Sequence, residues 1–446
     1  MIANILTKSI TLNYKNILNL MLFAFLILFS SIADAQEAAP AVSPEVAYIL
    51  NTFLFLVCGF LVMFMAAGFC MLEAGQVRSK NTAVICLKNI GLFSIAGLMY
   101  YLVGYNLMYD GVDGGYIGSF SMFDRSSDVD LETGYAAASD WYFQMVFVAT
   151  TASIVSGALA ERILIWPFFL FTAILTAFIY PIAGSWQWGG GWLSEMGFSD
   201  FAGSTIVHSV GGWAALTGAI LLGARKGKFD AKGNANVMAG QSIPMATLGV
   251  WILWLGWFGF NGASQLALGS YADANAVASI FANTTMAAAG GVIAPMVLSR
   301  IVDGKTNIGA TLNGAIAGLV SITAEPLTPS IGQAIIIGGI GGILCMYGMK
   351  LLDKLKIDDV VGAIPAHLVA GIWGTLIVPF TNADTSYGTQ IIGILAFGIF
   401  TVITTSIVWS ILKVAVGIRA SEEDEEYGLD LTETGTSGYP EYVSKK

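Results

Sequence analysis

The apolar positions of the chain gather into long runs that are separated by short polar segments. A helix that crosses the hydrocarbon core of a membrane needs roughly 20 predominantly apolar residues. Eleven runs approach this length, and the two weakest are short and interrupted by glycine or proline. We expect the spans at 46–72, 84–108, 140–161, 163–184, 203–224, 240–262, 274–299, 308–324, 330–352, 362–381 and 390–417. The pattern predicts an all-α polytopic membrane protein with eleven transmembrane helices.

A further apolar run near the N-terminus has the organisation of a secretory signal. Lys8 and Lys15 precede the run "ILNLMLFAFLILF", and the small residues "ADA" end at Ala35. A basic segment, an apolar segment and a small-residue cleavage site are typical of a signal peptide. We expect residues 1–35 to be a cleavable signal, which leaves the mature N-terminus outside the cytoplasm. The alternative is an uncleaved first helix.

The basic residues provide a test of this span count. With the N-terminus outside, the odd-numbered loops are cytoplasmic and should be rich in Lys and Arg. These loops and the segment after the last span hold Arg78, Lys80, Arg162, Arg225, Lys226, Lys228, Lys232, Arg300, Lys305, Lys350, Lys354, Lys356, Lys413 and Arg419. The opposite loops hold Arg125. The distribution favours a multi-pass protein of the cell (inner or plasma) membrane with its N-terminus outside and its C-terminus inside.

The composition agrees with a membrane protein. The chain is 56% hydrophobic and 11% charged, whereas soluble domains are about 25% charged. Its 52 glycines indicate closely packed helices, because small residues let helices approach each other in lipid. Residues 418–446 carry eight acids and three bases, so much of the net charge of −10 lies outside the membrane. We therefore expect a helical domain at 36–417 and an acidic cytoplasmic tail at 418–446.

The two histidines of the chain lie in one repeated frame. Residues 200–212 read "DFAGSTIVHSVGG" and residues 359–371 read "DVVGAIPAHLVAG". The first copy enters the membrane from outside and the second from inside, so spans one to five and six to ten are expected to form inverted repeats, followed by a final helix. At about 1.5 Å per residue, each histidine lies roughly 12 Å inside its boundary. In a core about 30 Å thick, the two imidazoles should meet near the middle.

Histidines at this depth are candidates for a functional role, because a polar side chain in lipid needs a partner or a purpose. The alternative is a histidine that is bonded to a backbone carbonyl or a hydroxyl. If His208 and His367 are in contact, they share one hydrogen bond through fixed tautomers and line a neutral path for a small solute or a proton. We expect Asp359 to cap its helix. Asp200 either caps its helix, fixes nearby carbonyls or stabilises an arriving cation.

Aromatic side chains gather at the expected outer ends of the spans. Phe143 and Phe147 are four residues apart and share a helix face. Trp188 lies in "SWQWGGG", and Phe260 lies about one turn deeper than Ser264 in "GWFGFNGAS". An interfacial aromatic belt and a cation–π site both explain this pattern, and the residues alone do not decide between them.

The pattern holds little that indicates enzymatic chemistry. The four cysteines lie in apolar segments and are expected to be buried packing residues without a disulfide. Two histidines with no cysteine or glutamate near them make a poor metal site. A membrane-embedded hydrolase is therefore disfavoured, and we expect no metal, no cofactor and no nucleic-acid partner.

Several segments resemble the ammonium transporter (Amt/Mep/Rh) family, in its bacterial and plant-type Amt branch. They occur in the family's order and read "GFCMLEAGQVRSKN", "FQMVF", "GALAER", "WGGGWLSEMGFSDFAGSTIVHSVGG", "GWFGFN", "DDVVGAIPAH" and "EEDEEYGLDLTETG". The resemblance implies an eleven-helix protomer in a homotrimer, with ammonium or ammonia as substrate. It also implies a trimeric PII-type signal protein as a partner at the cytoplasmic loops and tail. The tail departs from the family where it reads "TETG", and Pro365 shortly precedes the second histidine.

The resemblance also implies roles for individual residues. The outer recruitment site would comprise Phe147, Trp188 and Ser264, with Phe143 in the same wall, and Phe147 and Phe260 would form a gate. His208 and His367 would be the paired pore histidines, Thr323 would line the pore and Asp200 would support the outer site. Ammonium would lose its proton near the gate, and ammonia would cross. Electrogenic transport and neutral ammonia conduction remain open, as do an ammonium sensor and a Rhesus-type channel as alternatives.

Overall fold

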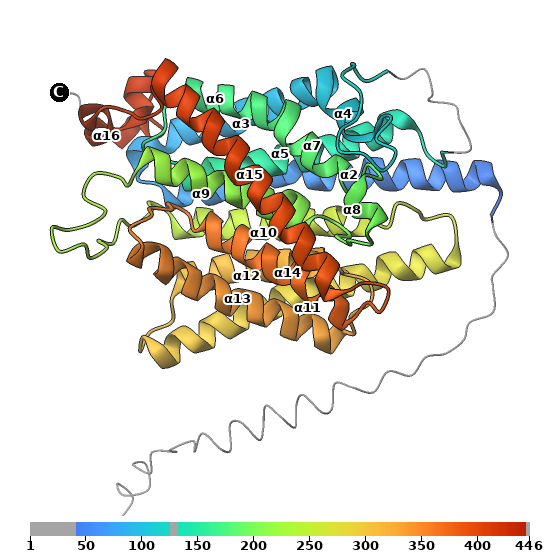
Figure 1. Ribbon diagram of the computed structural model, residues 1–446. Coiled ribbons are helices and arrows are strands. Elements are labelled where there is room, and N and C mark those ends of the chain that lie inside the picture. The colour runs from blue at the N-terminus through green and yellow to red at the C-terminus, as the bar shows by residue number, and fades with distance from the viewer. Residues whose placement is uncertain (1–41, 125–132, 443–446) are drawn as a thin grey trace, which may run out of the picture. The chain divides into compact units, whose positions relative to one another are not determined.

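The computed structural model describes residues 42–124 and 133–442. Helices make up the regular structure of this part of the chain, and its β-type pairings are two isolated bridges, Ile163 with Arg419 and Phe229 with Ala235. The described residues therefore confirm an all-helical protein (Figure 1). The expected signal at 1–35 lies outside the described residues.

Eight helical stretches of the described part are long and apolar enough to cross a membrane. They are α2 (Pro44–Gln76), Ser79–Tyr109 with α3 (Thr82–Met99) and α4 (Tyr105–Tyr109), Ile165–Ser185 with α6 (Ile165–Ile174) and α7 (Tyr180–Ser185), Ser204–Leu222 with α9 (Val210–Leu222), α10 (Ile243–Ala263), α11 (Tyr271–Val302), α13 (Ile331–Lys354) and α15 (Tyr387–Ala415). The remaining three expected ranges also fall on helices. These are α5 (Ala137–Ala158), α12 (Ile308–Thr323) and a short apolar stretch at Ile364–Phe380 that contains α14 (Ala370–Ile377).

Polar residues set where many of these helices begin. A helix leaves its first backbone N–H groups without partners, and a side-chain oxygen at the start can accept from them. Ser330 forms a reciprocal pair with Gln333 at the start of α13. Single caps begin α2, α10, α11, α12 and α15, from Ser43, Ser242, Ser270, Asn307 and Ser386. Within the apolar runs the helices satisfy their own backbone groups, as lipid requires.

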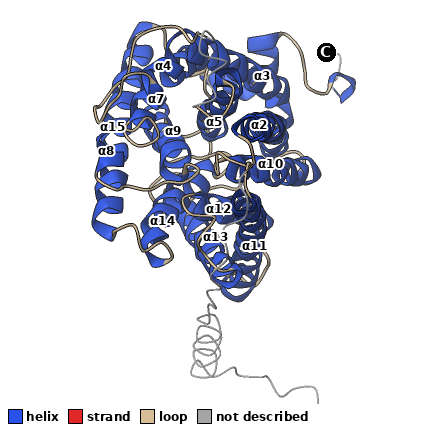
Figure 2. Ribbon diagram, turned by 90° about the vertical axis from the view of Figure 1, so that its right-hand side faces the viewer, coloured by secondary structure: helices blue, strands red, loops and turns tan. Residues whose placement is uncertain are grey.

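Glycines bring neighbouring helices into backbone contact. A Cβ at Gly249 of α10 would lie 2.3 Å from the backbone N of Leu72 on α2, and one at Gly338 of α13 would lie 1.9 Å from the backbone O of Ala287 on α11. Figure 2 shows α2 beside α10, and α11 beside α12 and α13. The close packing expected from the glycine content is confirmed. Of the four cysteines, Cys86 is exposed, so the expectation that all are buried was wrong, because an apolar residue of a membrane helix also lies on its outer face.

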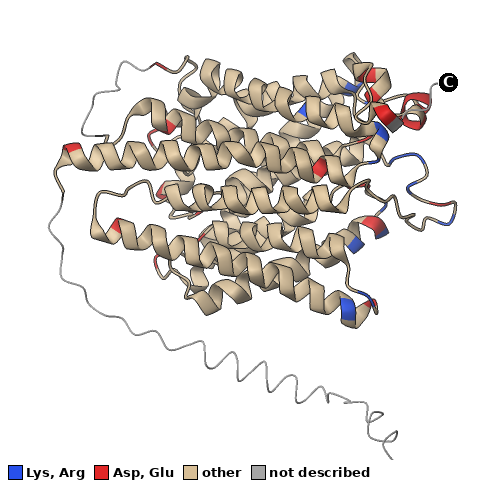
Figure 3. Ribbon diagram, turned by 180° about the vertical axis from the view of Figure 1, so that it is seen from behind, with Lys and Arg blue, Asp and Glu red and all other residues tan. Residues whose placement is uncertain are grey.

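Residues 418–442 pack onto the loops at one end of the helical bundle, which we call the tail side. After α15 the tail contains α16 (Glu422–Tyr427), the π-helical turn η7 (Asp430–Thr434) and the 3-10 turn η8 (Pro440–Tyr442). The hydrogen bonds that join it to the loops and helix ends include Ala420 N to Arg162 O, Val84 N to Asp430 Oδ1, Leu429 N to Asn81 Oδ1, Ile165 N to Glu433 Oε2 and Lys226 N to Glu425 Oε1. Figure 3 shows Lys and Arg gathered at this same end.

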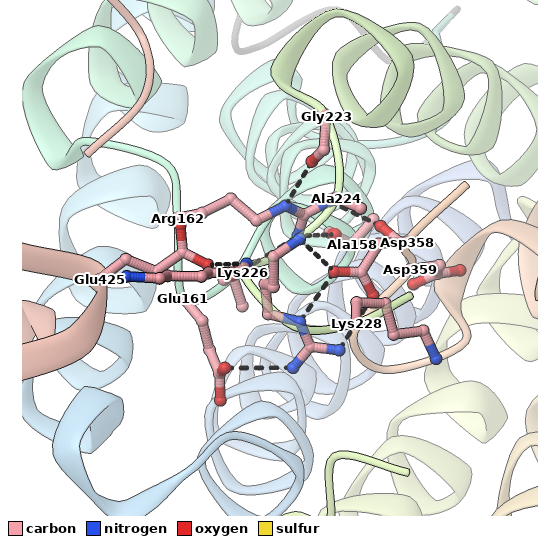
Figure 4. A network of polar contacts seen from close by, with 12 residues as sticks. Ala158, Glu161, Arg162, Gly223, Ala224, Lys226, Lys228, Asp358, Asp359 and Glu425 are labelled. Carbon is pink, nitrogen blue, oxygen red and sulfur yellow. Dashed lines mark hydrogen bonds and ion pairs between the residues drawn. The ribbon is translucent and has the colours of Figure 1, made fainter. Parts of the chain in front are cut away.

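A buried ionic network lies beneath the tail (Figure 4). Arg225 holds both oxygens of Asp358 through Nε and Nη2, at 2.8 and 2.9 Å, and its Nη1 donates to Glu161 at 3.1 Å. Arg162 Nη2 donates to the backbone O of Asp358 at 2.6 Å. Burial alone would raise the pKa of Asp358, but the hydrogen bonds from Arg225 and the charge of Arg162 outweigh it and lower the pKa to about 2. The ionised carboxylate of Asp358 therefore stabilises the folded state at any pH above its unfolded-state pKa near 3.9. This stabilisation is lost as the pH falls towards 2.

We predict that Gly249→Ala lowers the thermal unfolding temperature. The added methyl group would collide with the backbone of α2, and overpacking of this kind costs about 1–3 kcal/mol. The matched control is Gly388→Ala, where the added Cβ would meet Ser386 Oγ at 3.7 Å, an ordinary contact. Unfolding of both purified variants in detergent, followed by tryptophan fluorescence, checks this. Equal melting temperatures for the two variants would contradict the proposed backbone contact.

We also predict that Asp358→Asn is strongly destabilising. The change leaves Arg225 buried without its main counter-charge, and breaking a buried pair costs roughly 3–5 kcal/mol. Asp353→Asn is the control, because Asp353 pairs with Lys228 at the surface, where a pair contributes about 0–1 kcal/mol. The same unfolding measurement compares the two variants. A similar loss in both would show that the network adds no stability beyond that of a surface pair.

Candidate functional site

The repeated frame begins with a carboxylate that fixes the start of a helical turn. Asp200 Oδ1 accepts from the backbone N–H groups of Gly203 and Ser204 at 3.0 and 2.8 Å, and its Oδ2 accepts from Thr205 and Ile206 at 2.8 and 2.9 Å. Both oxygens are thus occupied by the backbone. Among the roles that the sequence left open, the geometry confirms capping, and Asp200 offers no free carboxylate oxygen to a cation.

Asp359 repeats this arrangement at the same offsets. Its Oδ1 accepts from the N–H groups of Gly362 and Ala363 at 3.0 and 3.2 Å, and its Oδ2 accepts from Ile364 at 2.7 Å. The glycine three residues after each aspartate has a positive φ, +107° at Gly203 and +76° at Gly362, which other residues adopt only with strain. The expectation that Asp359 caps its helix is confirmed.

Each histidine lies in a π-helical turn. His208 belongs to η4 (Ser204–Ser209) and His367 to η5 (Ile364–Val369). Such turns are rare and often mark functional positions, because the extra residue changes the direction of a side chain. Pro365 lies in η5, but η4 forms the same turn without a proline, so Pro365 is not needed to produce it.

The glycine four residues after each histidine lets the two segments meet. A Cβ at Gly212 would lie 2.6 Å from Cβ of Leu368, which follows His367. A Cβ at Gly371 would lie 2.5 Å from Oγ of Ser209, which follows His208. The contact is therefore reciprocal, and each glycine leaves room for the other segment.

The two imidazoles are in direct contact. Their Nδ1 atoms are 3.2 Å apart and their ring centroids 5.2 Å apart. His208 and His367 are buried, with 0% and 2% of their surfaces exposed. Since one Nδ1 must donate and the other accept, the contact fixes a different tautomer on each ring. Nε2 of His208 has no hydrogen-bond partner among the described residues.

Trp257, which the sequence reasoning did not single out, forms the next wall of the site. Its ring lies 4.9 Å from that of His208, and its Nε1 donates to Oγ1 of Thr323 at 2.8 Å. Thr323 is therefore linked to His208 indirectly, because it accepts a hydrogen bond from the tryptophan whose ring packs on that histidine. The sequence could have indicated this position, because Trp257 is three residues from Phe260 and that spacing puts both rings on one face of α10. Phe69 was missed as well, and its ring lies 6.2 Å from that of His367.

A row of aromatic rings leads away from His208 toward the end of the bundle opposite the tail. Phe260 lies 5.3 Å from His208 and stacks on Phe147 at a centroid distance of 3.9 Å. Phe147 in turn meets Trp188 edge-on at 5.9 Å and Phe143 at 4.8 Å. Four aromatic positions singled out from the sequence are thus brought into one continuous row.

Two further contacts complete this end of the row. Trp188 Nε1 donates to the backbone O of Asp200 at 2.9 Å, so the aspartate that begins η4 also anchors the outermost indole. Ser264 Oγ donates to the backbone O of Phe260 at 2.8 Å, which leaves the hydroxyl oxygen able to accept. The arrangement offers rings and a hydroxyl acceptor at the end of the row far from the histidines and two imidazoles in contact at its other end.

Comparison with known proteins gives one consistent family. The Ammonium Transporter Family profile matches residues 53–439, a range that includes every residue of this site. A putative ammonium transporter of Synechocystis sp. is 42% identical over 414 residues, which cover 92% of this chain and 93% of that protein. Ammonium transporter Amt2 of Archaeoglobus fulgidus is 41% identical over 419 residues, covering 87% and 88%.

Solved structures agree with these sequence relationships. A chain described as a sensor Amt protein has a TM-score of 0.83 and 33% identity, and the match covers 88% of this chain and 100% of that one. Candida albicans Mep2 has a TM-score of 0.76 and 25% identity, with coverages of 86% and 89%. Sequence and fold therefore agree over most of the molecule, and the chain belongs to the ammonium transporter family.

Proposed function

We propose that this protein takes up ammonium across the cell membrane through a pore of its own. The single observation that carries the proposal is the row of aromatic rings that ends on two buried imidazoles in contact. Family membership and relatives named as ammonium transporters support the substrate. The structural similarity to a sensor Amt protein makes an ammonium sensor the second candidate function. The relatives at 41–42% identity are named transporters and favour transport.

We infer eleven membrane spans with the tail side in the cytoplasm. Helices on all eleven expected ranges, the basic residues at the tail side and the reciprocal histidine segments support this topology. In it, the two halves of the domain are inverted repeats and the histidines lie at their seam. A homotrimer and a PII-type partner at the tail side are part of the same proposal, by resemblance to the family.

In the proposed mechanism, ammonium is recruited where Trp188, Phe147 and Ser264 line the outer end of the row, with Phe143 behind them. Rings attract a small cation within about 6 Å, and a hydroxyl acceptor favours ammonium over potassium because potassium donates no hydrogen bond. The stacked Phe147 and Phe260 then act as a gate. A bare charge near the membrane centre is costly, so ammonium gives up its proton to the imidazole pair that lies beyond Phe260, and it continues as ammonia.

Ammonia then passes the paired histidines, and the proton that ammonium lost follows through the same two imidazoles. Neutral imidazoles accept and donate hydrogen bonds without adding charge, which suits a small polar solute. Because the Nδ1 contact joins the two rings, a proton that arrives at one can leave from the other. Net charge movement follows from this coupling, and it distinguishes the proposal from neutral conduction of ammonia.

We predict that His208→Ala and His367→Ala each reduce ammonium current by about tenfold or more, because the remaining imidazole loses its buried partner at a cost of roughly 1–3 kcal/mol. The double variant should be little worse than either single one, since both remove the same contact. Currents from proteoliposomes on a supported membrane, with potassium as the competing cation, measure activity and selectivity. Unchanged current and selectivity in both single variants would rule out a role of the two histidines in conduction.

Trp188→Leu should weaken transport more at low ammonium than at high ammonium. A cation–π contact contributes about 0.5–2 kcal/mol, so the half-saturating concentration should rise several-fold. Trp188→Phe is the control, because it keeps a ring but loses the hydrogen bond to the backbone O of Asp200, and it should lie between Leu and the wild type. An equal loss at all concentrations would count against an outer cation site.

A further inference from the structure

Glu73, near the tail-side end of α2, is a buried carboxylate that caps no helix. Its Oε2 accepts from Ser156 Oγ at 2.7 Å and from Asn89 Nδ2 at 3.3 Å, and Lys88 Nζ lies 3.9 Å away. Its Oε1 has no hydrogen-bond partner in the described part of the chain, although only 1% of the residue is exposed. A carboxylate oxygen buried without a partner is costly, so the position requires an explanation.

Glu73 and His367 line the same small cavity. The cavity has a volume of about 10 Å³ and is also lined by Phe69, Ser153 and Asn313. This is room for about one molecule of the size of water, and ammonia is of similar size. The sequence reasoning placed no glutamate near the histidines, and that was wrong, because Glu73 reaches this cavity from a helix distant in sequence.

Gly157 of α5 lies against both Glu73 and Val361, and its missing side chain makes room for Val361. A Cβ at that position would lie 3.4 Å from Cγ of Glu73 and 2.5 Å from Cγ2 of Val361. Val361 and Asn313 line both the small cavity and a second cavity of about 390 Å³, which reaches Arg225 and Lys228 among the tail-side loops. From the histidines toward the tail side, Glu73 therefore comes before the larger cavity.

We propose that Glu73 is the proton-exchange group of the tail-side half of the pathway. The inference rests on the proposed function and names the residue that turns ammonia back into ammonium. Oε1 is the free oxygen of the pair, and Oε2 is held by Ser156. Lys88 lies beside Oε2 as a fixed positive charge that stabilises the carboxylate after its proton has left.

The exchange balances in atoms and charge. The protonated carboxyl of Glu73 gives its proton to the nitrogen of ammonia, so one O–H bond breaks and one N–H bond forms. The products are ammonium and the Glu73 carboxylate, and ammonium leaves through the larger cavity. The proton that ammonium lost at the aromatic end arrives by way of His367 and restores the carboxyl group. One ammonium ion has then crossed for each cycle.

The test uses the full chain in proteoliposomes and records two signals after an ammonium pulse. Current on a supported membrane reports charge, and a pH-sensitive dye inside vesicles reports ammonia entry as alkalinisation. Glu73→Gln keeps the shape but removes the exchangeable proton. A general acid or base accelerates its step by roughly 10²–10⁴, so the current should fall at least about tenfold. Ammonia that still enters then arrives without its proton and should appear as alkalinisation.

Two further variants separate chemistry from structure. The double variant Glu73→Gln with Lys88→Met removes both charges, so no unpaired lysine remains, and it should also lack current and show alkalinisation. Glu325→Gln is the matched control. Glu325 is another buried carboxyl, and it lies two residues after the last residue of α12. It accepts hydrogen bonds from Leu327, Thr328 and Asn382. This control should keep the wild-type current.

The proposal is overturned if Glu73→Gln keeps the wild-type current. It is also overturned if adding Lys88→Met to Glu73→Gln restores the current, because the defect of the single variant would then come from the unpaired lysine. Absence of both current and alkalinisation in the single and double variants would assign Glu73 a structural role and also overturn the proposal. A wild-type protein with neither signal would instead refute the proposed function itself.

Discussion

The contact between Nδ1 of His208 and Nδ1 of His367 is the interaction on which the rest of the site depends. It joins two segments that are 159 residues apart, and it exists because each segment is fixed at both ends of its π-helical turn. A carboxylate holds the start of the turn, and a glycine after it lets the other segment approach. A shift of either segment by one residue would turn its imidazole away and leave a polar ring buried without a partner.

The sequence predicted the parts of this arrangement that follow from spacing. Equal offsets from aspartate to histidine to glycine predicted that the imidazoles would meet, since the helix rise is the same in both copies. The row formed by Phe143, Phe147 and Phe260 also followed from helical periodicity, together with the resemblance. Trp257 and Glu73 did not, because their places depend on how α10 and α2 pack around the histidine segments, and no local pattern records that packing.

The sequence predicted that Asp359 caps its helix, but it left open which groups Asp200 binds. A helix-start carboxylate and a cation ligand carry the same residue type, and only the count of hydrogen bonds to Asp200 distinguishes them. The π-helical turns were not expected either, because a single extra residue in a turn leaves the apolar pattern almost unchanged. Burial of the ionic network around Arg225 and Asp358 was likewise missed, since their neighbours in sequence read as an ordinary charged loop.

The two halves of the proposed pathway differ in where a negative charge is available. At the aromatic end, the carboxylate of Asp200 is fully occupied by backbone N–H groups, so a cation there meets rings and the Ser264 hydroxyl oxygen. At the tail-side end, Glu73 keeps one oxygen free beside the cavity of His367. Rings hold a cation without taking its proton, whereas a carboxyl group exchanges one. This asymmetry suits a path in which the ion arrives intact, crosses as a neutral molecule past the imidazoles and becomes an ion again on the far side.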